Sequence, residues 1–186
     1  LQSLFKLLPQ DDHIYLDILK KQPNCCFWFI HGLRNSISSI FKERISKLFQ
    51  NYDLSFNEYS IFHPRCAKDE YLGLIEQSDI ILDSLNWSGG NTSLEAISLN
   101  KPIVTCPSEF MRGRHTYSIL KKLNIEETIA SSKEKYVEIA VRLAKDNDFR
   151  NSIISKIVKN KKKLFNDDKP IKFFEEVIKK RNASLN

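Results

Sequence analysis

The residues with the clearest potential for chemistry lie in the run DIILDSLNWSGGNTSLE, at positions 79–95. Here a short apolar strand is expected to stop before a Gly-Gly-Asn-Thr turn that opens directly into a helix. The first backbone N–H groups of a helix have no intrahelical partner and, together with the helix dipole, attract anions. Gly89 and Gly90 let a bulky anion approach the backbone, while Asn91 and Thr92 add side-chain donors. The pattern favours a phosphate-bearing ligand, although the same residue types also cap ordinary helices.

Strand-like and helix-like segments alternate along the chain. Continuous apolar runs such as CCFWFI are typical of strands buried on both faces, and segments with apolar residues at helical spacing separate them. We expect strands at 25–30, 59–62, 79–82, 102–106 and 127–130, and helices at 9–21, 36–49, 68–77, 92–99, 109–123, 133–145, 149–164 and 171–180. This alternation predicts an α/β fold with a parallel sheet covered by helices on both faces.

In parallel sheets of this kind, ligands bind beyond the carboxyl ends of the strands. The residues that directly follow the predicted strands are therefore the candidates for a site, and many of them are cationic or small. They are Lys6, His31, Gly32, Arg34, residues 63–66, residues 83–91 and residues 107–114. The chain contains neither GxGxxG nor GxxxxGK[ST], which argues against a simple dinucleotide dehydrogenase and against a P-loop NTPase.

Two arginines, Arg112 and Arg114, open the helix that is predicted after the strand at 102–106. A positive charge at a helix N-terminus is unfavourable by itself. A bound anion would explain both arginines, which makes them further candidates for phosphate binding. His115 falls inside the same predicted helix and is expected to be structural.

The composition is that of an ordinary soluble protein. The 186 residues leave room for one sizeable domain, and 41% of them are hydrophobic and 28% charged. No apolar run approaches the roughly 20 residues that span a bilayer, and no signal peptide is recognisable. The four cysteines show neither CxxC nor Cys/His spacing, so we expect reduced thiols, no metal site and a cytoplasmic location.

The net charge of +6 is concentrated in residues 151–186, which hold ten Lys or Arg against four Asp or Glu. A basic tail of this kind could contact nucleic acid or an anionic membrane. However, its apolar residues recur at helical spacing with lysines on the other face, which is typical of solvated helices. No RRM, KH or helix-turn-helix signature accompanies the lysines, so we expect no nucleic-acid partner.

Several segments, taken in order, resemble the C-terminal catalytic half of the protein O-linked N-acetylglucosamine transferase and SPINDLY family. The longest is SDIILDSLNWSGGNTSLEAISLNKPIVTCPSEFMRGRHTYSILKKL. Upstream of it lies LFKLLPQDDHIYLDILKKQPNCCFWFI, and downstream lie ASSKEKYVEIAVRLAKDNDFR and LFNDDKPIKFFEEV. The pattern is that of bacterial members fused to tetratricopeptide repeats, and it covers nearly the whole chain. The resemblance implies a Rossmann-like, doubly wound parallel sheet, the C-terminal donor-binding domain of a GT-B glycosyltransferase.

The resemblance also implies roles for individual residues. Lys6 falls where a lysine of the family stabilises the departing diphosphate. Cys66 and Lys68 fall where the chain touches the base, and Glu95 falls where an acid contacts the ribose. The turn at 89–92 coincides with the phosphate-binding residues of the family. The physics agrees, because a leaving diphosphate needs a cation when no metal ion is used.

The chain departs from the animal enzymes at three of these positions. Those enzymes carry histidines in place of Gly90 and Tyr71, and an aspartate in place of Glu95, whereas bacterial relatives share the Gly-Gly-Asn-Thr form. The departures leave the nucleotide base and the sugar open.

The implied activity is metal-independent, inverting transfer of a sugar to Ser or Thr hydroxyls of an acceptor protein. The donor is a nucleotide-sugar, UDP-GlcNAc in the first place, and no other cofactor is expected. Transfer to a lipid or polysaccharide remains an alternative, as does a non-catalytic nucleotide-binding or interaction module.

We expect residues 1–165 to form the nucleotide-sugar-binding domain, with its first strand truncated and LQSLFK as the tail of that strand. Residues 166–186 are expected to form a helix that crosses back toward the first Rossmann-like domain of the family. That domain, the general base and the repeats are expected elsewhere in the same polypeptide, because the chain reads as part of a longer protein.

Overall fold

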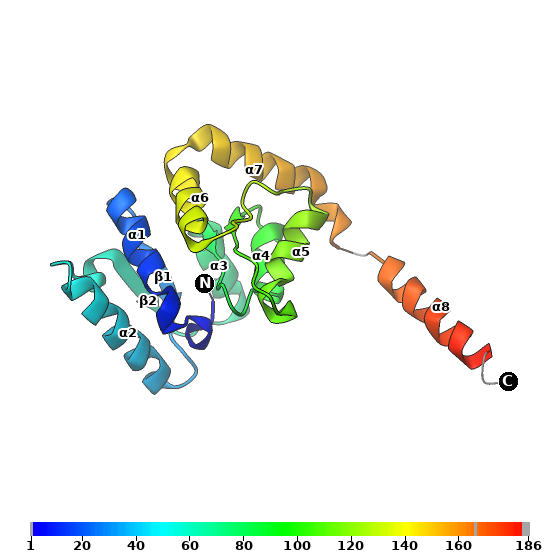
Figure 1. Ribbon diagram of the computed structural model, residues 1–186, viewed down its shortest axis with the longest axis horizontal. Coiled ribbons are helices and arrows are strands. Elements are labelled where there is room, and N and C mark those ends of the chain that lie inside the picture. The colour runs from blue at the N-terminus through cyan, green and yellow to red at the C-terminus, as the bar shows by residue number, and fades with distance from the viewer. Residues whose placement is uncertain (1, 166, 184–186) are drawn as a thin grey trace.

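The computed structural model describes residues 2–165 and 167–183, in which short strands alternate with helices (Figure 1). The strands are β1 (Phe27–Ile30), β2 (Ser60–His63), β3 (Ile81–Leu82) and β4 (Ile103–Val104). The α-helices are α1 (His13–Lys21), α2 (Asn35–Gln50), α3 (Lys68–Gln77), α4 (Asn91–Ser98), α5 (His115–Lys122), α6 (Lys133–Lys145), α7 (Asn147–Asn160) and α8 (Lys169–Ala183). The order confirms the predicted α/β alternation.

All strand pairing is parallel within the described residues. β1 pairs with β2 along the full length of both strands, and β3 pairs with β4 in the same way. No ladder joins β1 to β3 there, so the predicted sheet is present as two parallel pairs. A cleft of about 510 Å³ separates them, and its lining includes Gln2, Trp28 and Leu82.

Two predicted strand segments take another form. Leu4–Lys6 is a 3₁₀ turn, closed by a 3.1 Å hydrogen bond from Leu7 N to Leu4 O. The expectation that LQSLFK ends a strand is therefore wrong for these residues, because the chain turns here and buries Leu4 in the core. The strand expected at 127–130 is reduced to one parallel bridge between Thr105 and Ile129.

The helix predicted at 109–123 begins only at His115. Met111–Gly113 form a separate 3₁₀ turn, and Arg114 then adopts a non-helical backbone, with φ −126° and ψ 5°. Tight packing fixes this turn, since a Cβ on Gly113 would lie 1.9 Å from Ser108 Oγ. The sequence pattern does not reveal a contact of this kind.

The two strand pairs are packed by different side chains. Aromatic rings surround β1 and β2, and the Phe29 ring centroid lies 5.1 Å from that of Phe41 and 5.0 Å from that of Phe62. Aliphatic side chains fill the space around β3 and β4, among them Ile97, Ile103, Val104, Leu120, Leu123 and Ile125.

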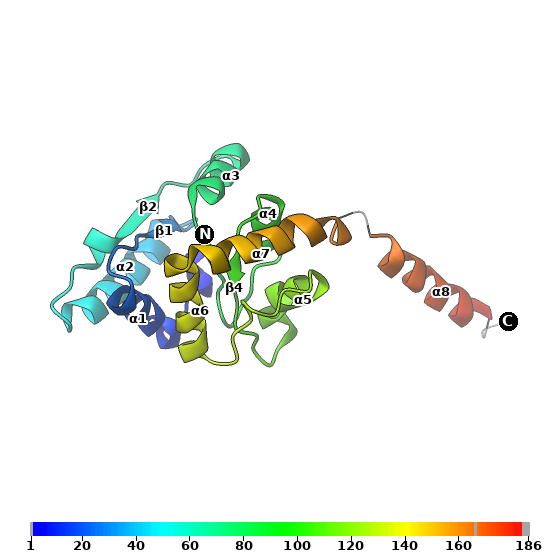
Figure 2. The ribbon, with the colours of Figure 1, turned by 90° about the horizontal axis from the view of Figure 1, so that it is seen from above.

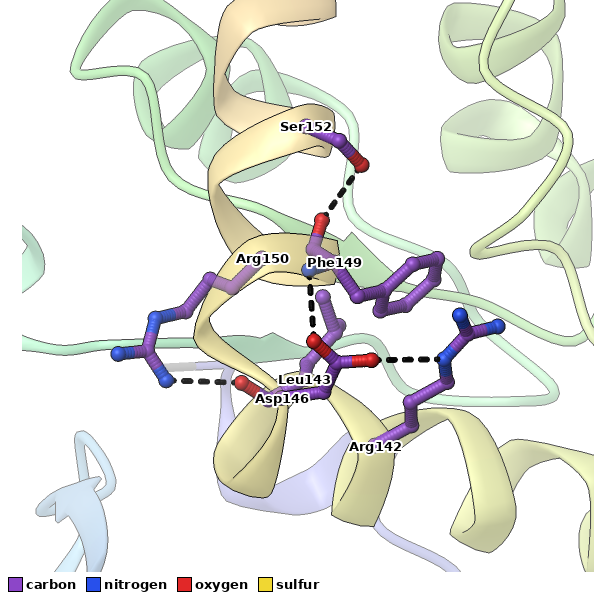
Figure 3. Close-up of polar contacts among 6 residues, drawn as sticks. All are labelled: Arg142, Leu143, Asp146, Phe149, Arg150 and Ser152. Atoms are coloured by element: carbon purple, nitrogen blue, oxygen red, sulfur yellow. Dashed lines mark hydrogen bonds and ion pairs between the residues drawn. The ribbon is translucent and has the colours of Figure 1, made fainter.

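The corner between α6 and α7 is held by polar contacts (Figure 3). The Asp146 carboxylate accepts a 2.8 Å hydrogen bond from Phe149 N and thereby caps α7. Arg150 donates at 2.8 Å to the Leu143 carbonyl near the end of α6, and the Arg142 guanidinium lies 3.8 Å from the Phe149 ring centroid. These contacts hold α6 in its position against β4.

The last helix, α8, extends away from the rest of the molecule in both views (Figures 1 and 2). None of its residues is buried. Its large apolar side chains are all exposed: Ile171, Phe173, Phe174, Val177 and Ile178. Packing of this helix against another domain stays a prediction. No helix among the described residues has the length and apolar character needed to cross a membrane.

Candidate functional site

The candidate site lies at the carboxyl ends of β3 and β4, where residues 83–90 lead into α4. Gly90 is the N-cap of α4, and Asn91 and Thr92 are its first two residues. The glycine turn therefore opens directly into the helix, as the sequence predicted. Asn91 is exposed and Thr92 is half-buried, so a ligand can reach the first turn of α4.

The buried carboxylate of Asp83 holds this loop in place. It accepts hydrogen bonds from Gly89 N at 2.7 Å, from Ser88 Oγ at 2.8 Å and from Thr105 Oγ1 at 2.7 Å. Burial raises the pKa of Asp83, and these donors oppose that shift by stabilising the charged form. The Asp83 backbone carbonyl accepts a further bond, at 2.9 Å, from the Tyr136 hydroxyl of α6.

Buried hydroxyls extend this network to the beginning of α5. Thr116 N donates to Ser88 Oγ at 2.9 Å, and the Thr116 hydroxyl lies 2.7 Å from that of Ser93 on α4. The N-terminal turns of α4 and α5 are thus joined through side chains. Because fully satisfied buried polar networks permit few alternative arrangements, this one fixes the geometry of the turn.

The two glycines of the turn have different surroundings. A Cβ on Gly89 would lie 2.4 Å from Gln2 Nε2 and 2.4 Å from Ser93 Oγ, so no side chain fits there. A Cβ on Gly90 would meet nothing closer than His115 Nδ1, at 3.8 Å. Gly89 is therefore required by packing within the protein, and Gly90 alone leaves open space for an approaching anion.

Lys6 lies beside this turn although it is far from it in the sequence. Its Nζ lies 3.5 Å from Ser88 O and 3.5 Å from Gln2 Oε1, and Gln2 donates onward to Thr92 Oγ1 at 3.0 Å. Burial lowers the pKa of Lys6, and the negative charge of Asp83 opposes that shift. Within the described residues Lys6 forms no ion pair, so its charge is free to meet an anion at the turn.

Three further predicted residues lie along α3 and α4. Cys66 is half-buried, and Lys68 is exposed at the start of α3. Burial raises the pKa of Tyr71, and the charges of Glu95 and Cys66 add to the shift. Glu95 is half-buried on α4.

Arg114 and His115 lie where the loop after β4 enters α5. Arg114 donates to Ser108 O at 3.1 Å and lies 4.7 Å from the Tyr117 ring centroid, so it is bound within its own loop. His115 is the first residue of α5, not an interior one, and its Nδ1 faces Gly90.

Comparison with known protein families identifies the family of this chain. Residues 1–171 match the sequence profile of glycosyl transferase family 41. The chain belongs to this family.

Curated relatives share modest identity with the chain. A UDP-N-acetylglucosamine–peptide N-acetylglucosaminyltransferase of Caenorhabditis elegans is 25% identical over 155 residues, which are 83% of this chain and 13% of that protein. A UDP-glucose:protein N-beta-glucosyltransferase of Actinobacillus pleuropneumoniae is 25% identical over 162 residues, 86% of this chain and 25% of that protein.

A solved structure shows the fold. A mutant of Thermobaculum terrenum O-GlcNAc transferase superposes with a TM-score of 0.80 at 23% identity, covering 95% of this chain and 34% of that one. The Rossmann-like part of a GT-B architecture is thereby confirmed. The chain spans about a third of that structure, and a smaller share of the curated relatives.

Several residues that build the candidate site had no part in the sequence-based prediction. Gln2, Thr116 and Tyr136 hold the turn and Lys6 in place, yet no spacing pattern singles them out. Among the described residues, no group of three or more His, Cys, Asp or Glu side chains is arranged to hold a metal ion.

Proposed function

We propose that this chain is the donor-binding half of a glycosyltransferase that moves N-acetylglucosamine from UDP-GlcNAc to Ser or Thr hydroxyls of an acceptor protein. One observation carries the proposal: in a family 41 chain, the Lys6 amine lies beside the open N-terminus of α4. The name of the C. elegans relative supports the UDP-N-acetylglucosamine donor and the peptide acceptor.

In this reaction the acceptor hydroxyl attacks the anomeric carbon while the bond from that carbon to the diphosphate oxygen breaks. The electron pair leaves with the diphosphate, and the anomeric configuration inverts. Charge therefore grows on the phosphates in the transition state, where Lys6 and the first N–H groups of α4 stabilise it. A general base, which we expect outside this chain, accepts the proton of the hydroxyl.

The remaining site residues bind the donor in this proposal. Asn91 and Thr92 contact the phosphates together with the backbone at Gly90, and Glu95 contacts the ribose. Cys66 and Lys68 lie along the base, next to Tyr71. Arg114 contributes positive potential beside the phosphates from its position in the loop before α5.

A second candidate is transfer of glucose to protein nitrogen. The name of the A. pleuropneumoniae relative favours it, and that relative matches 86% of this chain. Both candidates use a uridine nucleotide and a protein acceptor, so they share the phosphate site and differ in the sugar. Transfer to lipid or polysaccharide has no such support among the relatives.

The domain arrangement is part of the proposal. A strand of the same polypeptide, preceding Gln2, would lie in the cleft between β1 and β3 and join the two pairs into one sheet. The lining of the cleft supports this arrangement, because it includes Gln2 and residues of both β1 and β3. The other Rossmann-like domain and the repeats would belong to the same polypeptide, with α8 packing against that domain. The cytoplasmic location and the absence of a metal requirement likewise stay proposals.

Calorimetry with UDP and GDP on the folded chain tests the nucleotide site, and UDP is expected to bind. The chain alone is expected not to transfer sugar, since a GT-B cleft needs both domains. In the longer polypeptide, transfer from UDP-GlcNAc to a Ser/Thr peptide in the presence of EDTA is the expected result. Absence of nucleotide binding at millimolar concentration, even in the longer polypeptide, would refute the proposal.

A further inference from the structure

Two aromatic side chains lie exposed beside the candidate phosphate site. Phe5 and Trp87 retain 57% and 49% of their surface in contact with solvent. Their ring centroids are 6.0 Å apart and the planes meet at 86°, an edge-to-face pair. The two residues are far apart in the sequence, so the fold itself brings them together.

The backbone beneath Trp87 is held firmly. Its carbonyl accepts a 2.6 Å hydrogen bond from Ser84 Oγ. The next residue, Ser88, is buried, and its N–H donates at 2.8 Å to Arg112 O in the neighbouring loop. The backbone at Trp87 is thus fixed, and its half-exposed ring presents apolar surface beside the site, as ligand sites do.

The pair also flanks the cation of the site. Phe5 directly precedes Lys6, and Trp87 directly precedes Ser88, whose carbonyl lies 3.5 Å from Lys6 Nζ. A diphosphate between Lys6 and the N-terminus of α4 carries its sugar on the terminal phosphate. A sugar that extends from the phosphates past Lys6 on the side of Phe5 and Trp87 would meet the two rings. A pyranose has one face of C–H groups, which packs against aromatic rings.

We propose that Trp87, supported edge-on by Phe5, is the wall against which the transferred sugar stacks, and that this contact helps to select the sugar. The inference rests on the proposed function and adds a specificity-determining residue to it. Neither ring contacts the nucleotide in this arrangement. Trp87 therefore distinguishes the nucleotide-sugar from the free nucleotide.

The stacking role is tested by the ratio of the affinities for UDP-GlcNAc and for UDP. Calorimetry measures both affinities on each variant. The Trp87→Ala variant should lose the extra affinity for UDP-GlcNAc, a change of about tenfold, and bind UDP within about twofold of the wild type. Tyr52→Ala is the control, because Tyr52 is similarly exposed, at 44%, but lies after α2 with Lys20 Nζ 3.7 Å from its ring centroid. It should leave the ratio unchanged.

Wild-type protein labelled with 5-fluorotryptophan gives a test that leaves Trp87 itself unchanged. The sequence contains two tryptophans, and Trp28 lies in the other strand pair against His63. The fluorine signal of Trp87, assigned with Trp28→Phe, should shift further with UDP-GlcNAc than with UDP, while that of Trp28 stays in place.

Equal shifts with both ligands, or an unchanged affinity ratio in Trp87→Ala, would overturn the stacking role while leaving the nucleotide site intact. A longer polypeptide with both Rossmann-like domains that binds neither UDP nor UDP-GlcNAc would overturn the proposed function, and the stacking role with it.

Discussion

The two parallel strand pairs share a topology but are built from different chemistry. Around β1 and β2 the contacts are between rings, with Phe29 packed against Phe41 and Phe62. Beyond β3 and β4 the contacts are hydrogen bonds, centred on the buried carboxylate of Asp83 and the hydroxyls of Ser88 and Thr105.

The difference matters because the two kinds of contact specify structure differently. Apolar packing tolerates side chains of similar volume and stabilises the fold without a unique arrangement of polar atoms. A buried polar network requires each donor to meet its acceptor, and therefore permits few alternative arrangements. The packing around β1 and β2 thus stabilises the fold, while the polar network beyond β3 and β4 fixes the position of the first turn of α4.

The largest expected effect separates these roles directly. Phe41→Ala should lower the free energy of unfolding by about 3–5 kcal/mol and leave the UDP affinity of the folded protein unchanged. Asp83→Ala leaves several buried donors without an acceptor, which costs at least about 2–3 kcal/mol, and it should also abolish UDP binding. Urea denaturation and calorimetry measure the two quantities. Loss of UDP affinity in a folded Phe41→Ala protein would contradict the separate roles of the aromatic packing and the polar network.

Lys6→Ala is expected to have the next largest effect, in the polypeptide that catalyses transfer. Because charge develops on the leaving diphosphate, turnover should fall about a hundredfold or more, with a much smaller loss of donor affinity. Lys47→Ala is the control, since Lys47 forms an exposed pair with Glu43. A change confined to KM would make Lys6 a ground-state phosphate ligand and refute its catalytic role.

How far the sequence predicted this site depends on whether the relevant signal is local. The helices at 68–77 and 133–145 were placed at the observed bounds, because periodicity and flanking residues define them. The turn at 89–92 was found from adjacent residue types, and Lys6 from its position and the family resemblance.

Non-local contacts had no such signal. The partners of Asp83 lie up to 53 residues away, at Tyr136, so no spacing pattern connects them. The start of α5 at His115 depends on the packing of Gly113 against Ser108, which single-sequence patterns do not reveal. The division of the sheet into two pairs is likewise a property of tertiary structure.

A smaller effect is expected at the glycine turn, where Gly90 serves as the control for its neighbour Gly89. Gly89→Ala forces a Cβ to within 2.4 Å of Gln2 Nε2 and Ser93 Oγ. It should cost about 1–3 kcal/mol of stability and weaken UDP binding, as overpacked sites do. Gly90→Ala has free space and should change stability by less than about 0.5 kcal/mol. Equal stability losses in the two variants, measured by urea denaturation, would show that the crowding at Gly89 relaxes.

The pH dependence of transfer tests the environment of Lys6. Burial lowers the pKa of Lys6, so its positive charge is lost as the pH rises, beginning at a lower pH than for an ordinary lysine. Above that pKa, turnover should fall about tenfold per pH unit, following the charged fraction. The arginine of Lys6→Arg keeps its charge throughout, so the turnover of this variant should not fall at high pH. A parallel decline in both proteins would assign the titration to another group.

The smallest expected effect concerns α8, which belongs to neither strand pair. No residue of α8 is buried, and an ion pair from Lys122 to Asp167 ties the segment before it to the body. Removing residues 166–186 should therefore change the free energy of unfolding by less than about 1 kcal/mol, the usual contribution of a surface ion pair. It should also reduce self-association, because Phe173 and Phe174 expose apolar surface. Thermal unfolding and analytical ultracentrifugation of the shortened chain measure both effects. A marked loss of stability would mean that α8 folds back onto the two strand pairs in solution, and that its exposed face is covered by this chain itself.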